Sequence, residues 1–101
     1  MGRRIELQDA LEEALGSVNV YYQPPENLRL KFPCIVYEKT PGYTWRADNA
    51  LYRYKEEYTV TVIARDPDLP VLDTLRGWPL CRYDRRFTHD QLYHDVYSLY
   101  Y

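Results

Sequence analysis

Two His-Asp pairs are the residues whose types could carry catalysis or bind a metal ion. His89-Asp90 and His94-Asp95 offer imidazole and carboxylate groups, which serve in general acid–base chemistry and as metal ligands. Their five-residue spacing argues against a joint site, because it places the two histidines on opposite faces of a strand and about 140° apart on a helix. A turn between them would restore the geometry. One hypothesis is therefore a small metal-dependent enzyme built on His89 and His94. The alternative is that these residues form a polar turn that leads into the last strand.

The two cysteines, Cys34 and Cys81, stand alone without a CxxC spacing. A nucleophilic cysteine needs a neighbouring base and an activating field, and the local sequence supplies neither. We read both as buried thiols in a reducing compartment, although a single disulfide stays open. No phosphate-binding loop, nucleophile elbow or metalloprotease motif is present. The sequence thus predicts a non-enzymatic protein with no catalytic residue, metal or cofactor.

A basic and aromatic stretch offers a different chemistry. Arg82, Arg85 and Arg86 lie beside Tyr83 and Phe87, and such a stretch can stack on bases and contact phosphates. A single-stranded nucleic-acid-binding module is therefore the alternative function. The net charge of -2 argues against nonspecific nucleic-acid binding, which requires a basic excess. We expect Arg85 to share its strand face with Tyr83 and Phe87, where it could instead pair with a neighbouring acid.

The elements that must position these residues include two helices. Leu7, Leu11 and Leu15 recur at helical spacing, which predicts an amphipathic helix over about 4–15. The segment 66–70 reads as the start of a second helix, with an aspartate capping the free N–H groups and proline in the first turn. Gly77 ends that helix.

Strand signals fill most of the remaining sequence. Alternation is strongest over about 53–65, and shorter strands are expected at 18–22 and 34–37. Two strands after the second helix, around 81–87 and 92–101, form a terminal hairpin. The order predicts one α+β domain over 1–101, with a mostly antiparallel sheet of four to six strands and both helices on one face. A protruding loop or hairpin arm is expected around 43–54.

Twelve tyrosines give the sequence its most unusual composition. A domain of this size buries only about two-thirds of its unfolded surface, so some aromatic area must face solvent or a partner. We assign Tyr37 and Tyr58 to the core. The arm and the last strand are the candidate contact regions, because their aromatic side chains exceed what one core can hold.

No apolar stretch is long enough to span a membrane. The start, Met1-Gly2-Arg3-Arg4, has no apolar run behind it, so it does not read as a signal peptide. We therefore expect the chain to be made and assembled in the cytoplasm, without a membrane partner.

Several segments together resemble the small tail-completion proteins of long-tailed bacteriophages, also called tail terminator or tail-to-head joining proteins. The likeness covers most of the chain from about Leu11 onward and is carried by order and spacing. The matching segments are 20–25, 30–37, 58–63 running into 66–68, and Phe87 with 94–97.

The resemblance implies a non-enzymatic α+β subunit that closes a ring, commonly a hexamer, on the tail tube of a phage or prophage. Its expected partners are further copies of itself, the tail tube protein and head-completion or connector proteins, in the tail or neck of the virion. DNA is expected only if it passes through the ring lumen. A ring needs two different complementary patches on each subunit, and aromatic residues and arginine are enriched at such contacts. The predicted interface residues are Tyr43, Trp45, Arg46, Tyr52, Tyr54, Tyr93, Tyr97 and Tyr101.

Overall fold

The computed structural model describes residues 2–40 and 56–101 of the chain. Its elements are, in order, α1 (Gly2–Leu15), β1 (Val20–Tyr22), β2 (Cys34–Lys39), β3 (Glu57–Ala64), α2 (Pro70–Arg76), β4 (Cys81–His89) and β5 (Leu92–Tyr100). The predicted arm lies outside the described residues. None of the described helices is long and apolar enough to cross a membrane.

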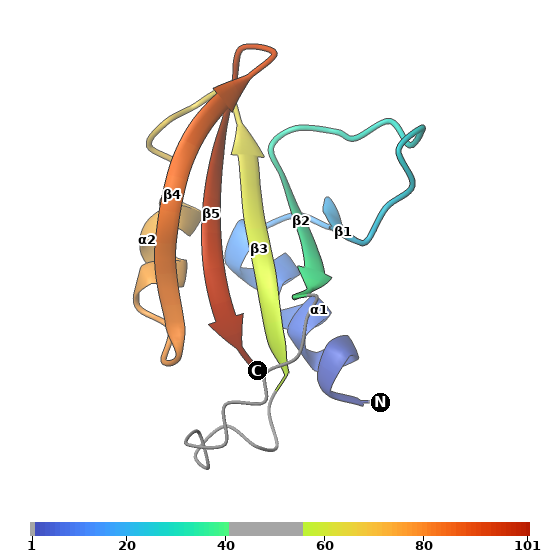
Figure 1. The fold of residues 1–101 in the computed structure, drawn as a ribbon, viewed down its shortest axis with the longest axis vertical. Coiled ribbons are helices and arrows are strands. Elements are labelled where there is room, and N and C mark those ends of the chain that lie inside the picture. Colours follow the sequence, from blue (N-terminus) through green and yellow to red (C-terminus); the bar gives the residue numbers. More distant parts are fainter. Residues whose placement is uncertain (1, 41–55) are drawn as a thin grey trace.

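The five strands form one sheet in the order β1-β2-β3-β5-β4 (Figure 1). Only β1 and β2 run parallel, and the other neighbours are antiparallel. The predicted α+β class with a mostly antiparallel sheet is therefore confirmed. So is the terminal hairpin of β4 and β5, which turns through Asp90 and Gln91, both with positive φ (54° and 64°). Positive φ at both central residues suits the right-handed twist of a two-residue hairpin.

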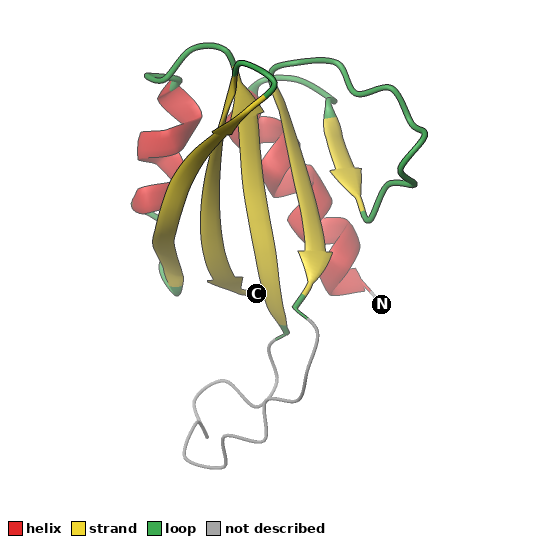
Figure 2. Ribbon diagram, turned by 45° about the horizontal axis from the view of Figure 1, so that its top comes forward, coloured by secondary structure: helices red, strands yellow, loops and turns green. Residues whose placement is uncertain are grey.

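Both helices cover the same face of the sheet, as predicted (Figure 2). Leu7 and Leu11 of α1, together with Val71, Leu72 and Leu75 of α2, pack against one set of strand side chains in the main core. That set follows the alternation expected of a half-buried strand. It includes the buried strand residues Tyr37, Tyr58, Val60, Val62, Tyr97 and Leu99.

The second helix begins differently from the prediction. Its N-cap is Leu69, which has no side chain that could cap the helix, and Pro70 occupies the first turn as expected. The Asp66 carboxylate instead accepts a hydrogen bond from the Asp68 backbone N–H at 2.8 Å. This local turn satisfies the aspartate before the helix starts, so the predicted aspartate cap is wrong. Gly77 ends the helix, as predicted.

The opposite face of the sheet carries a smaller apolar cluster. Cys34, Ile63 and Leu92 are buried there, and Leu30 packs against them from the loop between β1 and β2. The backbone N–H of Lys31 in the same loop lies 3.4 Å from the Tyr21 hydroxyl. The loop therefore covers part of this face, while no helix among the described elements does.

Candidate interaction surfaces

The helix-free face near β4 presents arginine and aromatic side chains. Tyr97 is fully buried on the helix side and pairs with Tyr83, so the alternating pairs Arg82–Ser98 and Phe87–His94 face the other way. Phe87 is 41% exposed, and its ring stacks on His94 with centroids 4.7 Å apart and planes 17° apart. We call this surface the Phe87 patch; it consists of Arg82, Arg85, Phe87 and His94.

A bulge in β4 decides which arginine joins this patch. Tyr83 pairs with Tyr97 but Arg85 already pairs with Val96, so one extra residue, Asp84, lies in β4. An extra residue reverses the alternation of faces beyond it. Arg85 therefore shares the face of Phe87, as predicted, but not that of Tyr83, which corrects the prediction. Arg85 pairs with the exposed Asp84 carboxylate at 2.7 Å.

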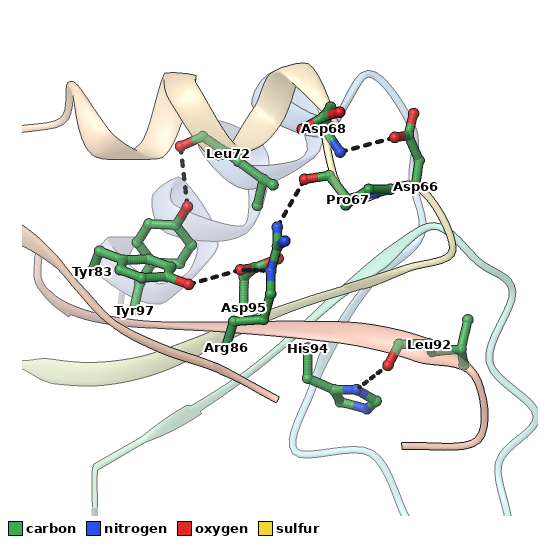
Figure 3. Close-up of polar contacts among 10 residues, drawn as sticks. All are labelled: Asp66, Pro67, Asp68, Leu72, Tyr83, Arg86, Leu92, His94, Asp95 and Tyr97. Atoms are coloured by element: carbon green, nitrogen blue, oxygen red, sulfur yellow. Dashed lines mark hydrogen bonds and ion pairs between the residues drawn. The ribbon is translucent and has the colours of Figure 1, made fainter. Parts of the chain in front are cut away.

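The bulge sends Arg86 to the helix side, where it meets a buried carboxylate (Figure 3). Asp95 is only 3% exposed. The Arg86 Nε donates to its Oδ1 at 2.8 Å and an Arg86 Nη to its Oδ2 at 3.2 Å. The Tyr83 hydroxyl adds a bond to Oδ1 at 3.0 Å, and Arg86 also donates to the Pro67 carbonyl at 2.8 Å. The network joins the hairpin to the segment that leads into α2.

The same network raises the pKa of two of its members. Burial, reinforced by the hydrogen bond to Asp95, raises the pKa of Tyr83. The hydrogen bond to Asp95 also raises the pKa of Arg86, which keeps its full charge. Arg86 is therefore committed to an internal ion pair. Of the three arginines predicted to contact nucleic acid, only Arg82 and Arg85 lie on the helix-free face.

The predicted interface tyrosines of the last strand differ in how far they are buried. Tyr97 is completely buried and donates its hydroxyl to the Leu72 carbonyl at 3.1 Å, so it has no exposed surface to offer a neighbouring subunit. That prediction is corrected. Tyr93 is half-buried beneath the Arg86 guanidinium, which lies 5.0 Å from its ring centroid. Tyr101 is half-buried and packs against the main core.

The other five predicted interface residues lie outside the described residues. They are Tyr43, Trp45, Arg46, Tyr52 and Tyr54.

A groove that the sequence did not reveal lies between α1, the α2–β4 connection and the end of β5. Its volume is about 740 Å³, and it is lined by Glu6, Ala10, Trp78, Pro79, Leu80, Leu99, Tyr100 and Tyr101. Leu80 is 38% exposed and has a positive φ of 63°. The Leu80 carbonyl accepts a bond from the Tyr100 N–H at 3.0 Å, which holds this conformation. We call this site the Trp78 groove.

A weak signal for this groove is present in the sequence. Trp78 and Leu80 form an apolar run directly after the helix stop at Gly77, in a position where a polar connection is usual. The contribution of α1 could not be inferred, because Glu6 and Ala10 are some 70 residues distant in the chain.

His89 and His94 lie on the same face of the sheet, because the hairpin turn between them places them on adjacent strands. The rings of His89 and His94 have centroids 6.2 Å apart, and His94 Nδ1 lies 3.3 Å from the Leu92 carbonyl oxygen. The turn thus supplies the geometry that their spacing alone argued against. Within residues 2–40 and 56–101, however, no group of three or more His, Cys, Asp or Glu side chains is arranged to hold a metal ion.

Both cysteines are free thiols. Cys34 is completely buried, as expected, whereas Cys81 is half-buried. Burial raises the pKa of each thiol from 9.0 to about 11. Because the thiolate is the reactive form, both are poor nucleophiles at neutral pH.

Comparison with known proteins returned no match: no family model, curated protein or solved structure matches this chain.

Proposed function

We propose that this chain is a non-enzymatic structural protein of a long-tailed phage or prophage, which forms a ring that caps the tail tube or joins tail to head. Two lines of support meet here. The order and spacing of its segments resemble the tail-completion family, and the α+β architecture is the one that this resemblance implies.

The observation that carries the proposal is the presence of two separate surfaces that each expose a large apolar side chain. The Trp78 groove is one, and the Phe87 patch is the other. A closed ring of identical subunits requires two different, complementary surfaces on each copy. Fully burying a Phe or Leu side chain contributes about 1.5–3 kcal/mol. Phe87 is 41% exposed and Leu80 38%, so covering each contributes about 1 kcal/mol to a contact.

The partners follow from this role. Other copies of the chain form the ring, commonly a hexamer, whose two faces meet the tail tube protein and the head-completion or connector proteins. The ring belongs to the tail or neck of the virion and assembles in the cytoplasm of the host bacterium. DNA contacts the chain only where it passes through the lumen.

The test is deletion of this coding sequence from a phage that carries it, followed by electron microscopy of the lysate. We expect tails of uncontrolled length, or tails and filled heads that stay apart, and we expect the wild-type chain supplied in trans to restore virions. Trp45→Ala and Arg46→Ala, supplied in the same way, test whether the 43–54 segment takes part in this role. Normal virions after the deletion would refute the proposal.

One observation favours single-stranded nucleic-acid binding as a second candidate. Phe87 is exposed and stacked on His94, with Arg82 and Arg85 on the same face, and bases stack readily on such aromatic side chains. This candidate predicts binding of a labelled single-stranded oligonucleotide that weakens steeply with added salt. Phe87→Ala would abolish binding, whereas Lys39→Met, at an exposed cation in β2 outside the patch, would not. No detectable binding at low salt eliminates it.

A further inference from the structure

We propose that the Phe87 patch of one copy docks into the Trp78 groove of the next copy, in a head-to-tail contact. This pairing rests on the ring proposed above and names the two surfaces that close it. Both surfaces consist of described residues, so the inference does not depend on the 41–55 segment.

The placement of the two surfaces suits a head-to-tail contact. Leu80 of the groove directly precedes β4, and Phe87 lies near the far end of that strand. The strand runs along the long axis of the molecule (Figure 1). Seven residues of strand separate the two side chains by about 20 Å. One copy can therefore use both surfaces at once, as each member of a ring or filament must.

The chemistry of the two surfaces is complementary. Phe87 offers an exposed ring, and the groove offers Trp78, Pro79 and Leu80 with a volume larger than one phenyl group. Docking would remove both apolar surfaces from water, which is favourable in proportion to the area covered.

Opposite charges flank these apolar surfaces. Glu6 lines the groove, and the exposed Asp9 and Glu13 lie on the same helix. Arg85 lies beside Phe87, with its guanidinium carbon 5.8 Å from the ring centroid, and Arg82 lies at the other end of the patch. Neither Glu6 nor Arg82 has an ion-pair partner among the residues that the structure describes. Arg85 contacts Asp84 in an exposed ion pair, which costs little to exchange. These charges also favour a second copy over nucleic acid in the groove, because the acidic helix repels phosphates.

The experiment uses two variants that each damage one surface. Leu80→Asp places a charge in the groove and leaves the patch intact, whereas Phe87→Asp does the reverse. Aspartate tolerates the positive φ of position 80 better than leucine does, so the backbone there is kept. Sedimentation velocity at matched concentrations gives the assembly state, and circular dichroism confirms folding. Leu28→Asp, at an exposed leucine outside both surfaces, is the matched control.

We expect the wild-type chain and Leu28→Asp to self-associate, and each of the other variants alone to sediment as a monomer. Loss of a central anchor weakens association by about 30-fold or more. An equimolar mixture of Leu80→Asp and Phe87→Asp should form a 1:1 dimer and nothing larger, because it retains one intact groove and one intact patch that can meet. Glu6→Arg should weaken self-association, and adding Arg85→Glu to the same chain should restore it.

Three results would overturn the pairing: a wild-type monomer at the highest soluble concentration, self-association of either single variant, or a mixture that stays monomeric. These results concern only the contact between copies. The proposed role in tails is judged by the deletion phenotype, so the two can fail separately.

Discussion

The ion pair between Arg86 and Asp95 gives a prediction whose size follows from burial. The Asp95 side chain is 4% exposed, and Arg86 supplies two of the three hydrogen bonds to its carboxylate. Arg86→Met removes the countercharge and leaves a buried carboxylate held by Tyr83 alone. Breaking a buried pair in this way costs about 3–5 kcal/mol. We expect about 3 kcal/mol, because the Arg86 side chain is 35% exposed and the site admits some water.

The neighbouring arginine is the matched control. Arg85 also contacts an aspartate, at 2.7 Å, but both side chains of that pair are about half exposed. Exposed pairs contribute about 0–1 kcal/mol, so Arg85→Met should change the free energy of unfolding by less than about 0.5 kcal/mol. The two variants remove the same charge from adjacent positions and differ in burial.

Urea unfolding followed by circular dichroism measures both effects. With a urea dependence of about 1.5 kcal/mol per molar, Arg86→Met should lower the midpoint by about 2 M. The double variant Arg86→Met with Asp95→Leu should recover at least about 1 kcal/mol, since it removes the stranded charge. Equal losses for Arg85→Met and Arg86→Met, or a double variant worse than Arg86→Met alone, would refute the reasoning.

Three further predictions concern single groups. Tyr97→Phe should cost about 1 kcal/mol in urea unfolding, because the Leu72 carbonyl loses a buried donor; no change would mean that the bond contributes nothing. Burial raises the pKa of Cys34 and Cys81 from 9.0 to about 11. The buried thiols therefore contribute their full share to the free energy of unfolding below pH 9.0, and this contribution declines as the pH rises toward 11. When the pH is raised from 8 to 10.5, the urea midpoint should therefore fall less in the double variant Cys34→Ala, Cys81→Ala than in the wild type. Gln91→Gly should stabilise the hairpin by about 1 kcal/mol, because glycine adopts its positive φ without strain; a lower midpoint would contradict this.

The elements that sequence patterns predicted well are those with strong local periodicity. Apolar residues recur at every second position around Tyr58 and Val60, and Leu7 and Leu11 recur with the period of a helix. In both cases a short stretch of sequence is enough to predict which side of the element is buried. The sequence pattern predicts the second helix correctly but not the residue at its N-cap. An aspartate before a helix can bond within a turn as readily as it caps, and Asp66 does the former.

Features that depend on distant contacts were missed. The bulge at Asp84 lets Arg86 reach the buried Asp95 while Phe87 stays outside, and nothing in the alternation of β4 marks an extra residue. The number of aromatic side chains in the last strand predicts Tyr97 at a contact surface, because they exceed what one core can hold. The central position of β5 and the packing of α2 decide instead that this side chain is buried.

The central position of β5 has a consequence for synthesis on the ribosome. It lies between β3 and β4 in the sheet but follows both of them in the sequence. In a nascent chain that ends after β4, the strands β1, β2 and β3 can pair, but the edge of β3 that binds β5 is open and β4 has no neighbouring strand. Residues 92–100 must leave the exit tunnel before the two parts join. Chains that stop before β5 would therefore present unpaired strand edges, which favour aggregation and proteolysis.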